Sequence, residues 1–157
     1  MNLAERTRQI DELAGLPARI EAAIAGLADD QLDTPYRDGG WTVRQVVHHL
    51  ADAHINGLIR AKLTLTEDHP TLKPYQQDPW AELADVRLPV APSLAILRGV
   101  HERWVVLLRS LPEAVWSRTA YHPEHGDMSL DDQLASYVRH GSTHTAQLEA
   151  LRARMGW

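Results

Sequence analysis

Four stretches of the sequence repeat apolar residues at steps of three and four, the spacing of one face of an α-helix. Runs of β-branched residues bounded by turns are scarce, so extensive sheet is not expected. Helices with one apolar stripe must bury it against one another. The sequence therefore predicts an all-α fold, an antiparallel up-down four-helix bundle in a single domain over residues 1–157. The expected helices lie within residues 4–28, from about 42 to 67, from about 93 to 111, and from about 129 to 154.

Local signals mark the ends of these helices. Thr42 with Gln45, and Ser129 with Asp132, have the spacing of a capping box, in which two side chains satisfy free backbone N–H groups at a helix start. Pro17 lies inside the first stretch, so that helix either starts there or is kinked there.

A long connection joins the second and third helices. Residues 68–91 contain four prolines, and the segment "PWAEL" within them fits a short helix. A loop of this length in a small domain is typically functional or forms an oligomer contact.

Composition excludes several classes of protein. The net charge of −5 argues against a nucleic-acid partner, which needs a basic face. The absence of cysteine excludes disulfides, thiolate metal sites and cysteine nucleophiles, so any thiol must arrive on a small molecule. The first residues are charged, and no stretch approaches the roughly 18 apolar residues of a membrane span. We therefore expect a cytoplasmic protein without membrane association.

Two of the nine histidines, His140 and His144, stand four residues apart in the last helix. At this spacing they lie one turn apart on the same face, which Tyr137 shares. Two imidazoles so placed can reach one metal ion, as in the zinc helices of metalloproteases, although Gly141 stands where those helices carry glutamate. The alternative is that the pair only packs.

The second helix offers further histidines in "VVHHLADAH". Three imidazoles with an open coordination position would make a catalytic metal site. Periodicity does not decide between His48 and His49 as the third ligand, and His48 also fits a pair with Asp52.

Other residues have two interpretations each. His101 lies on the apolar face of the third helix, either as a satisfied core residue or facing substrate or supporting a ligand. Arg60 either favours the dipole of its helix or contacts an anionic substrate. His48, Asp52 and Tyr137 are further candidates for facing substrate or supporting a ligand. Three more histidines fall in loops and are expected to be ordinary surface residues: His69, His122 and His125.

The blocks "DTPYRDGGWTVRQVVHHLADAHINGLIRAKLTLTEDHPTLKPY", "WAEL", "LRGVHERWVVLL" and "YVRHGSTHTAQL" occur in this order. Together they closely resemble the YfiT-like branch of the DinB superfamily, over roughly residues 10–155. The resemblance implies a four-helix bundle, often a homodimer, with a divalent metal held by three histidines. The family's first ligand stands eight residues after a tryptophan, which from Trp41 gives His49, and the other two match His140 and His144.

This sequence departs from the family pattern in the last block. Arg139 replaces a tryptophan, Thr143 the first of two paired histidines, and Gln147 a later histidine. None of the three is a ligand position, so the departures concern the pocket lining and the substrate.

The resemblance implies a metal-dependent enzyme, which would act on a small-molecule substrate. Three neutral imidazoles suit zinc, nickel or iron, of which we expect zinc or nickel. Our leading hypothesis is transfer of a low-molecular-weight thiol, such as bacillithiol, to an electrophile, since a metal-bound thiol loses its proton near neutral pH. The first alternative is a hydrolase that uses metal-activated water. The second is a metal-stabilised binding module without activity.

Overall fold

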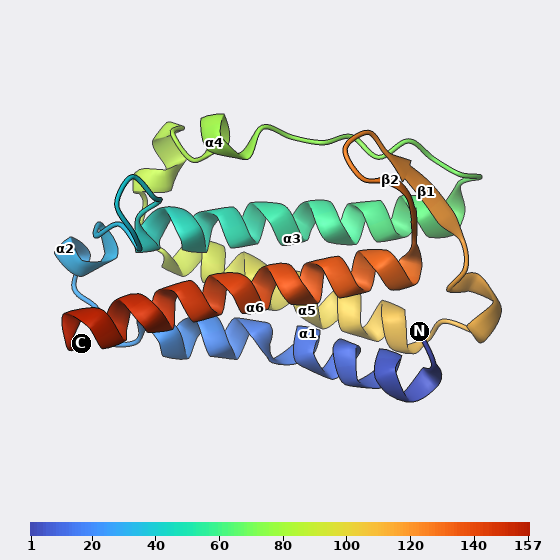
Figure 1. Cartoon of the computed structure of the whole chain (residues 1–157), viewed down its shortest axis with the longest axis horizontal. Coiled ribbons are helices and arrows are strands. Elements are labelled where there is room, and N and C mark those ends of the chain that lie inside the picture. The colour runs from blue at the N-terminus through green and yellow to red at the C-terminus, as the bar shows by residue number, and fades with distance from the viewer.

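The computed structural model describes residues 1–157, and four long helices pack along their lengths into one bundle (Figure 1). These helices are α1 (Leu3–Ile24), α3 (Val43–Thr66), α5 (Ala91–Arg109) and α6 (Leu130–Met155). The predicted four-helix bundle is therefore confirmed. None of the helices is long and apolar enough to cross a lipid bilayer.

Short elements lie in the connections between the long helices. The short helix expected around "PWAEL" corresponds to α4, which ends at Trp80. The only sheet is a two-stranded antiparallel hairpin, as the scarcity of β-branched runs predicted. The short elements are α2 (Asp29–Leu32), α4 (Gln77–Trp80), η1 (Ala84–Arg87), η2 (Glu113–Val115), β1 (Thr119–His122) and β2 (Gly126–Ser129).

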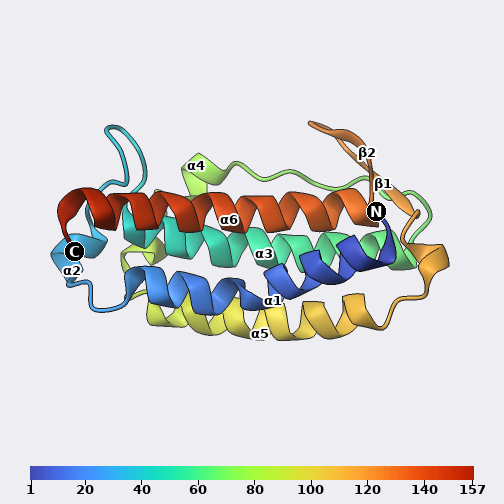
Figure 2. The ribbon, with the colours of Figure 1, turned by 60° about the horizontal axis from the view of Figure 1, so that its bottom comes forward.

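The helix ends follow the local signals. Both predicted capping boxes are present. The Thr42 hydroxyl accepts a hydrogen bond from the backbone N–H of Gln45, and the Ser129 hydroxyl accepts one from the backbone N–H of Asp132 at the start of α6. Pro17 does not start a helix, because α1 runs through it. Figure 2 shows the axis of α1 changing direction along its length, as expected where a proline removes a backbone bond.

The order of the helices places the two central ones side by side in parallel. His48 contacts Ser93 and His54 contacts His101, so α3 and α5 run in the same direction. His49 contacts His140 and Thr64 contacts Gln133, so α3 and α6 are antiparallel. The up-down alternation therefore holds between α1 and α3 and between α5 and α6. It is interrupted at α3 and α5 because residues 67–90 run back along the whole bundle before α5 begins (Figure 1). We call residues 67–90 the crossover.

The crossover is tied to the hairpin by two backbone hydrogen bonds. The Leu72 amide donates to the Tyr121 carbonyl at 2.8 Å, and the Tyr121 amide donates to the Pro70 carbonyl at 2.9 Å. Leu72 is buried, whereas most of the crossover is exposed. Crossover and hairpin thus form a wall beside α3 and α6 rather than part of the core.

The core divides into two apolar clusters along the bundle. One contains the C-terminal parts of α1 and α6 with the start of α3, including Ile20, Leu50 and Leu148. The other contains the opposite halves of the same helices, including Leu13 and Leu134. Between them, in the middle of the bundle, lies a layer that is rich in histidine: His49, His54, His101, His140 and His144.

Candidate metal centre

Three histidines of this layer bring their ring nitrogens together. His49 comes from α3, while His140 and His144 lie one turn apart on α6. The Nε2 atoms of His49 and His140 are 3.0 Å apart, and one nitrogen from each of the three lies within 4.8 Å of the others. Two nitrogens that each lie about 2.0–2.1 Å from one ion are themselves about 3 Å apart. The donor atoms therefore fit a single metal ion.

Burial keeps these three imidazoles neutral. Burial, with a smaller contribution from the neighbouring histidines, lowers the pKa of His49 to about 3 and the pKa of His140 to about 4. Burial also lowers the pKa of His144, although a hydrogen bond to Gln147 opposes this shift. Metals bind neutral imidazole, so none of the three rings has to lose a positive charge before a cation binds at neutral pH.

The same burial predicts a pH dependence of the metal-free protein. In the unfolded chain His49 and His140 take up protons below about pH 6.5, whereas in the folded protein they stay neutral until about pH 4. The unfolded state binds more protons in this window. The contribution of these histidines to the free energy of unfolding is therefore at its maximum above pH 6.5 and decreases as the pH falls toward 4. We expect the urea midpoint of metal-free protein to drop steadily between pH 7 and pH 5.

The matched control for this measurement is the double variant His140→Ala/His144→Ala. It has two fewer depressed pKa values, so its midpoint should depend less on pH over the same range. Equal pH dependence of the two proteins would contradict the assignment of the effect to this layer.

Two further histidines of the layer stand behind the candidate ligands. The His101 Nε2 lies 2.9 Å from the His54 Nδ1, and the His54 Nε2 lies 3.4 Å from the His140 Nδ1. Burial lowers the pKa of His101 to about 4 and that of His54 well below its usual value. His101 is therefore buried with a partner at each ring nitrogen, and it reaches the candidate ligand His140 only through His54. His54, the last histidine of "VVHHLADAH" and so one of the predicted sources of a third imidazole, is fully buried behind His140.

His48 points away from the three ligands. Its Nδ1 lies 2.7 Å from the Ser93 hydroxyl and its Nε2 lies 3.1 Å from the Leu88 carbonyl, so it joins α3 to the start of α5. Asp52 is half-buried, and burial raises its pKa. Neither residue lines the cavity described next, so the structure brings neither of them to the substrate side.

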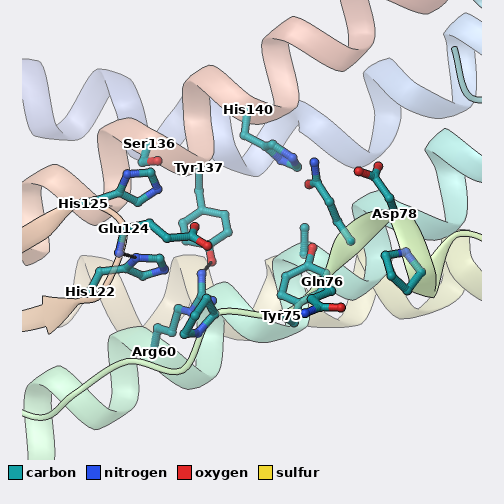
Figure 3. A pocket seen from close by; sticks show the side chains of 14 residues that line it. Arg60, Tyr75, Gln76, Asp78, His122, Glu124, His125, Ser136, Tyr137 and His140 are labelled. Atoms are coloured by element: carbon teal, nitrogen blue, oxygen red, sulfur yellow. Dashed lines mark hydrogen bonds between the residues drawn. The ribbon is translucent and has the colours of Figure 1, made fainter. Parts of the chain in front are cut away.

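A cavity of about 630 Å³ opens beside His140, between α3, α6, the crossover and the hairpin (Figure 3). Tyr137 and Arg60 lie on its floor, and the Arg60 Nη1 donates to the Tyr137 hydroxyl at 3.1 Å. The Arg60 Nη2 donates to the Lys73 carbonyl at 2.8 Å, and its buried Nε has no partner. None of these bonds goes to a carboxylate, so Arg60 keeps its charge available. This supports the substrate-facing interpretation of Arg60 and Tyr137.

The hairpin contributes histidines that were expected to be ordinary surface residues. That expectation is wrong for His122, which is only 4% exposed and lines the cavity. His125 is exposed, but its ring stacks on His122 and faces the same cavity (Figure 3). His69 is on the surface, as expected, and pairs with Asp127. No helical periodicity covers a hairpin, so the burial of His122 had no sequence signal.

The His122 ring accepts a hydrogen bond at Nδ1 and so has a donor N–H at Nε2. The Glu124 backbone amide donates to the His122 Nδ1 at 3.2 Å, so in the neutral ring the proton is on Nε2. Burial, together with the charge of Arg60, lowers the pKa of His122 and keeps it neutral. One ring nitrogen or carboxylate oxygen from each of His122, Glu124 and His125 also lies within 4.8 Å of the others. Because the hydrogen bond from the Glu124 amide occupies the lone pair of Nδ1 and the proton occupies Nε2, His122 has no free lone pair. The cluster of His122, Glu124 and His125 is therefore a poor metal site.

The departures from the family pattern touch the metal centre at one point only. Arg139 and Thr143 are exposed on α6 and line no part of the cavity. Gln147 lies one turn after His144, and its Oε1 is 2.9 Å from the His144 Nδ1.

Comparison with known proteins finds close relatives. A model of the DinB superfamily matches residues 12–148. A protein of Bacillus mycoides, named "Putative metal-dependent hydrolase", is 51% identical over 148 residues, which is 94% of this chain and 86% of that protein. A protein of Bacillus anthracis with the same name is 50% identical over the same shares.

A solved structure has nearly the same fold. YfiT from Bacillus subtilis is described as "a probable metal-dependent hydrolase with an unusual four-helix bundle topology". It superposes with a TM-score of 0.97 at 45% sequence identity, covering 100% of this chain and 91% of YfiT. Similarity at this level extends over the whole bundle, including the layer that holds the three histidines.

Proposed function

Because the chain belongs to the DinB superfamily, we propose that it is a metal-dependent enzyme whose ion is held by His49, His140 and His144. The observation that carries this proposal is the meeting of three neutral imidazoles, one of which, His140, lines the cavity. Nitrogen donors of this kind suit zinc or nickel, and three protein ligands leave a position for a small molecule. When bound, such a cation lowers the pKa of a coordinated thiol or water and so supplies a nucleophile.

The cavity supplies groups that bind the other substrate. Arg60, Tyr137 and His122 all present hydrogen-bond donors there: the guanidinium, a hydroxyl that already accepts from Arg60, and the Nε2–H of His122. Donors that are not paired with a carboxylate favour an oxygen acceptor or an anionic group on the substrate. These residues would hold the electrophile with its reactive atom toward His140.

Transfer of a low-molecular-weight thiol is the reaction that we favour. The chain has no cysteine, so the sulfur would come from a small thiol such as bacillithiol. No carboxylate stands among the three ligand nitrogens, so no general base is built into the metal centre. A thiol needs less help than water does, because its own pKa is near 8.5.

Hydrolysis is the second candidate, and two observations favour it. The relatives carry the name of metal-dependent hydrolases. Glu124 and Asp78 line the cavity, and either carboxylate is available as a general base for water.

Turnover of two probe substrates separates these reactions. The zinc-loaded and nickel-loaded proteins would be assayed with bacillithiol plus 1-chloro-2,4-dinitrobenzene, and separately with p-nitrophenyl acetate without thiol. Thiol-dependent loss of chloride identifies the transferase, and thiol-independent release of p-nitrophenol identifies the hydrolase. Neither reaction above the rate of the metal-free protein would contradict the enzyme proposal for these substrate classes.

Arg60→Gln is expected to weaken substrate binding without unfolding the protein. Loss of a charge-assisted hydrogen bond costs about 1.5–3 kcal/mol, so KM for an anionic electrophile should rise about 10-fold or more. The effect should be smaller for a neutral electrophile of the same shape. Arg139→Gln is the matched control, because Arg139 is exposed on α6 outside the cavity. If Arg60→Gln changed KM by the same factor for the anionic and the neutral electrophile, the role given to Arg60 would be contradicted.

A further inference from the structure

Two buried histidines connect the candidate metal centre to the backbone of α1. The His101 Nδ1 lies 2.7 Å from the Leu13 carbonyl oxygen, and its Nε2 lies 2.9 Å from the His54 Nδ1. The His54 Nε2 then lies 3.4 Å from the Nδ1 of His140. His54 is 0% and His101 2% exposed, so water does not compete for these contacts. The three rings form one continuous chain from α1 through α5 and α3 to α6.

The first link exists because of Pro17. In an α-helix the Leu13 carbonyl would accept a hydrogen bond from the N–H of residue 17. Proline has no N–H, and its ring pushes the carbonyl of the residue four positions earlier away. The Leu13 carbonyl is therefore left for another donor inside the bundle, and His101 of α5 provides it. The kink in α1 and the histidine of α5 thus satisfy each other.

A carbonyl oxygen only accepts, and this fixes the direction of every bond in the chain. The His101 Nδ1 must carry the proton that it donates to Leu13, so in the neutral ring its Nε2 accepts. His54 must then donate from Nδ1 to His101, and its own Nε2 accepts. The donor to that Nε2 is the Nδ1–H of His140, which leaves the His140 Nε2 with a free lone pair. The reversed chain would set a ring nitrogen lone pair against the Leu13 oxygen at 2.7 Å.

The other two candidate ligands, His144 and His49, carry their ring protons on different nitrogens. The Oε1 of Gln147 accepts from the His144 Nδ1–H, so the His144 Nε2 is free as well. Between His49 and His140 two Nε2 atoms face each other at 3.0 Å, and one proton must lie between them. Since the His140 Nε2 carries none, that proton belongs to His49. His49 is the one ligand that must exchange its Nε2 proton with solvent and take one at Nδ1 before it can bind a cation.

We propose that the Leu13 carbonyl, freed by Pro17, sets the tautomer of the ligand His140 through His101 and His54. In this role His54 and His101 are positioning residues, and they present the His140 Nε2 to a cation before the cation arrives. The inference rests on the proposed metal centre for its purpose, but not for its test, because the tautomers exist in the metal-free protein. A pair of histidines that merely fills the core would leave His140 free to adopt either tautomer.

The test is a long-range ¹H–¹⁵N spectrum of metal-free protein labelled at histidine nitrogen, which reads the tautomer of each ring. We expect the Nδ1–H form for His101, His54, His140 and His144, and the Nε2–H form for His49. An Nε2–H form or a mixture of forms at His140 would overturn the proposal. The wild-type spectrum alone decides this, so the test does not depend on any variant folding.

A variant pair tests the consequence for metal binding. His101→Phe keeps a ring of similar size but removes the acceptor of His54, so His140 should lose its single tautomer. Zinc affinity, measured by competition with a chelator, should fall roughly 10–100-fold with all three ligands in place. His48→Phe is the matched control, since His48 is also a buried histidine between α3 and α5 but lies outside the chain. Equal zinc affinities of the two variants would overturn the positioning role, and zinc binding with mixed tautomers would overturn it while leaving the metal centre intact.

Discussion

The double variant His140→Ala/His144→Ala is expected to contain no metal, whereas the native protein holds about one ion per chain. Removing two of three donors leaves a single imidazole, which does not retain a divalent ion. The loss of affinity should exceed the roughly 100-fold that changes to outer partners of a ligand cause. Elemental analysis after dialysis against zinc or nickel measures this directly, with His69→Ala as a control for loss of an exposed histidine.

A single substitution distinguishes catalysis from a purely structural metal. If the ion serves catalysis, His144→Ala should abolish turnover of the probe substrates with only a modest decrease in Tm. If the chain is a metal-stabilised binding module, the main effect should be a steep loss of Tm on metal removal, with no turnover in either protein. Native protein that takes up no ion after addition of zinc or nickel would sink the metal proposal and the enzyme proposal together.

Gly57→Ala is expected to destabilise the protein, although alanine is the better helix former. A Cβ atom at position 57 would meet the Trp104 ring and would lie 2.7 Å from the Tyr137 ring. Both aromatic rings are packed against each other, with centroids 5.1 Å apart, so neither can move freely. Overpacking of this kind costs about 1–3 kcal/mol or more, which exceeds the roughly 1 kcal/mol that alanine gains in a helix.

The control for this prediction is Gly99→Ala. Gly99 lies inside α5, and a Cβ there would meet nothing within 4 Å. Here the helix preference acts alone, so this variant should gain about 1 kcal/mol. Urea unfolding at neutral pH should show midpoints that move in opposite directions. A rise in both midpoints would mean that the Trp104 and Tyr137 rings yield at little cost.

The four long helices could be predicted from the sequence because local patterns indicate a helix and its start. Apolar steps of three and four gave the long helices, and the capping boxes at Thr42 and Ser129 gave two of their starts. The parallel arrangement of α3 and α5 was not readable in this way. It depends on the path of the crossover, which has no periodic signal of its own.

The three candidate ligands could be predicted from the sequence and its family resemblance. The roles of the residues around them could not. The spacing of His140 and His144 follows from one helix, whereas the choice of His49 over His48 needed the resemblance to a family. In the structure His49 lies with His140 and His144, whereas His48 contacts the Ser93 hydroxyl and the Leu88 carbonyl. His54 and His122 had no such signal, because their neighbours come from other helices or from a hairpin. Contacts between distant segments decide both positions.

The wall formed by the crossover and the hairpin has a consequence for how such proteins diversify. Its residues bound the cavity but contribute little to the apolar clusters, and Leu72 is one of few buried side chains in the crossover. Mutations there alter what fits beside His140 at little expense to folding, whereas mutations in the histidine layer affect folding and metal binding together. Under the proposed function, part of the substrate selectivity therefore lies on segments separate from the candidate metal centre, although Arg60 and Tyr137 of the bundle also line the cavity. A lineage can exchange substrates by drift in the wall while inheriting the same chemistry.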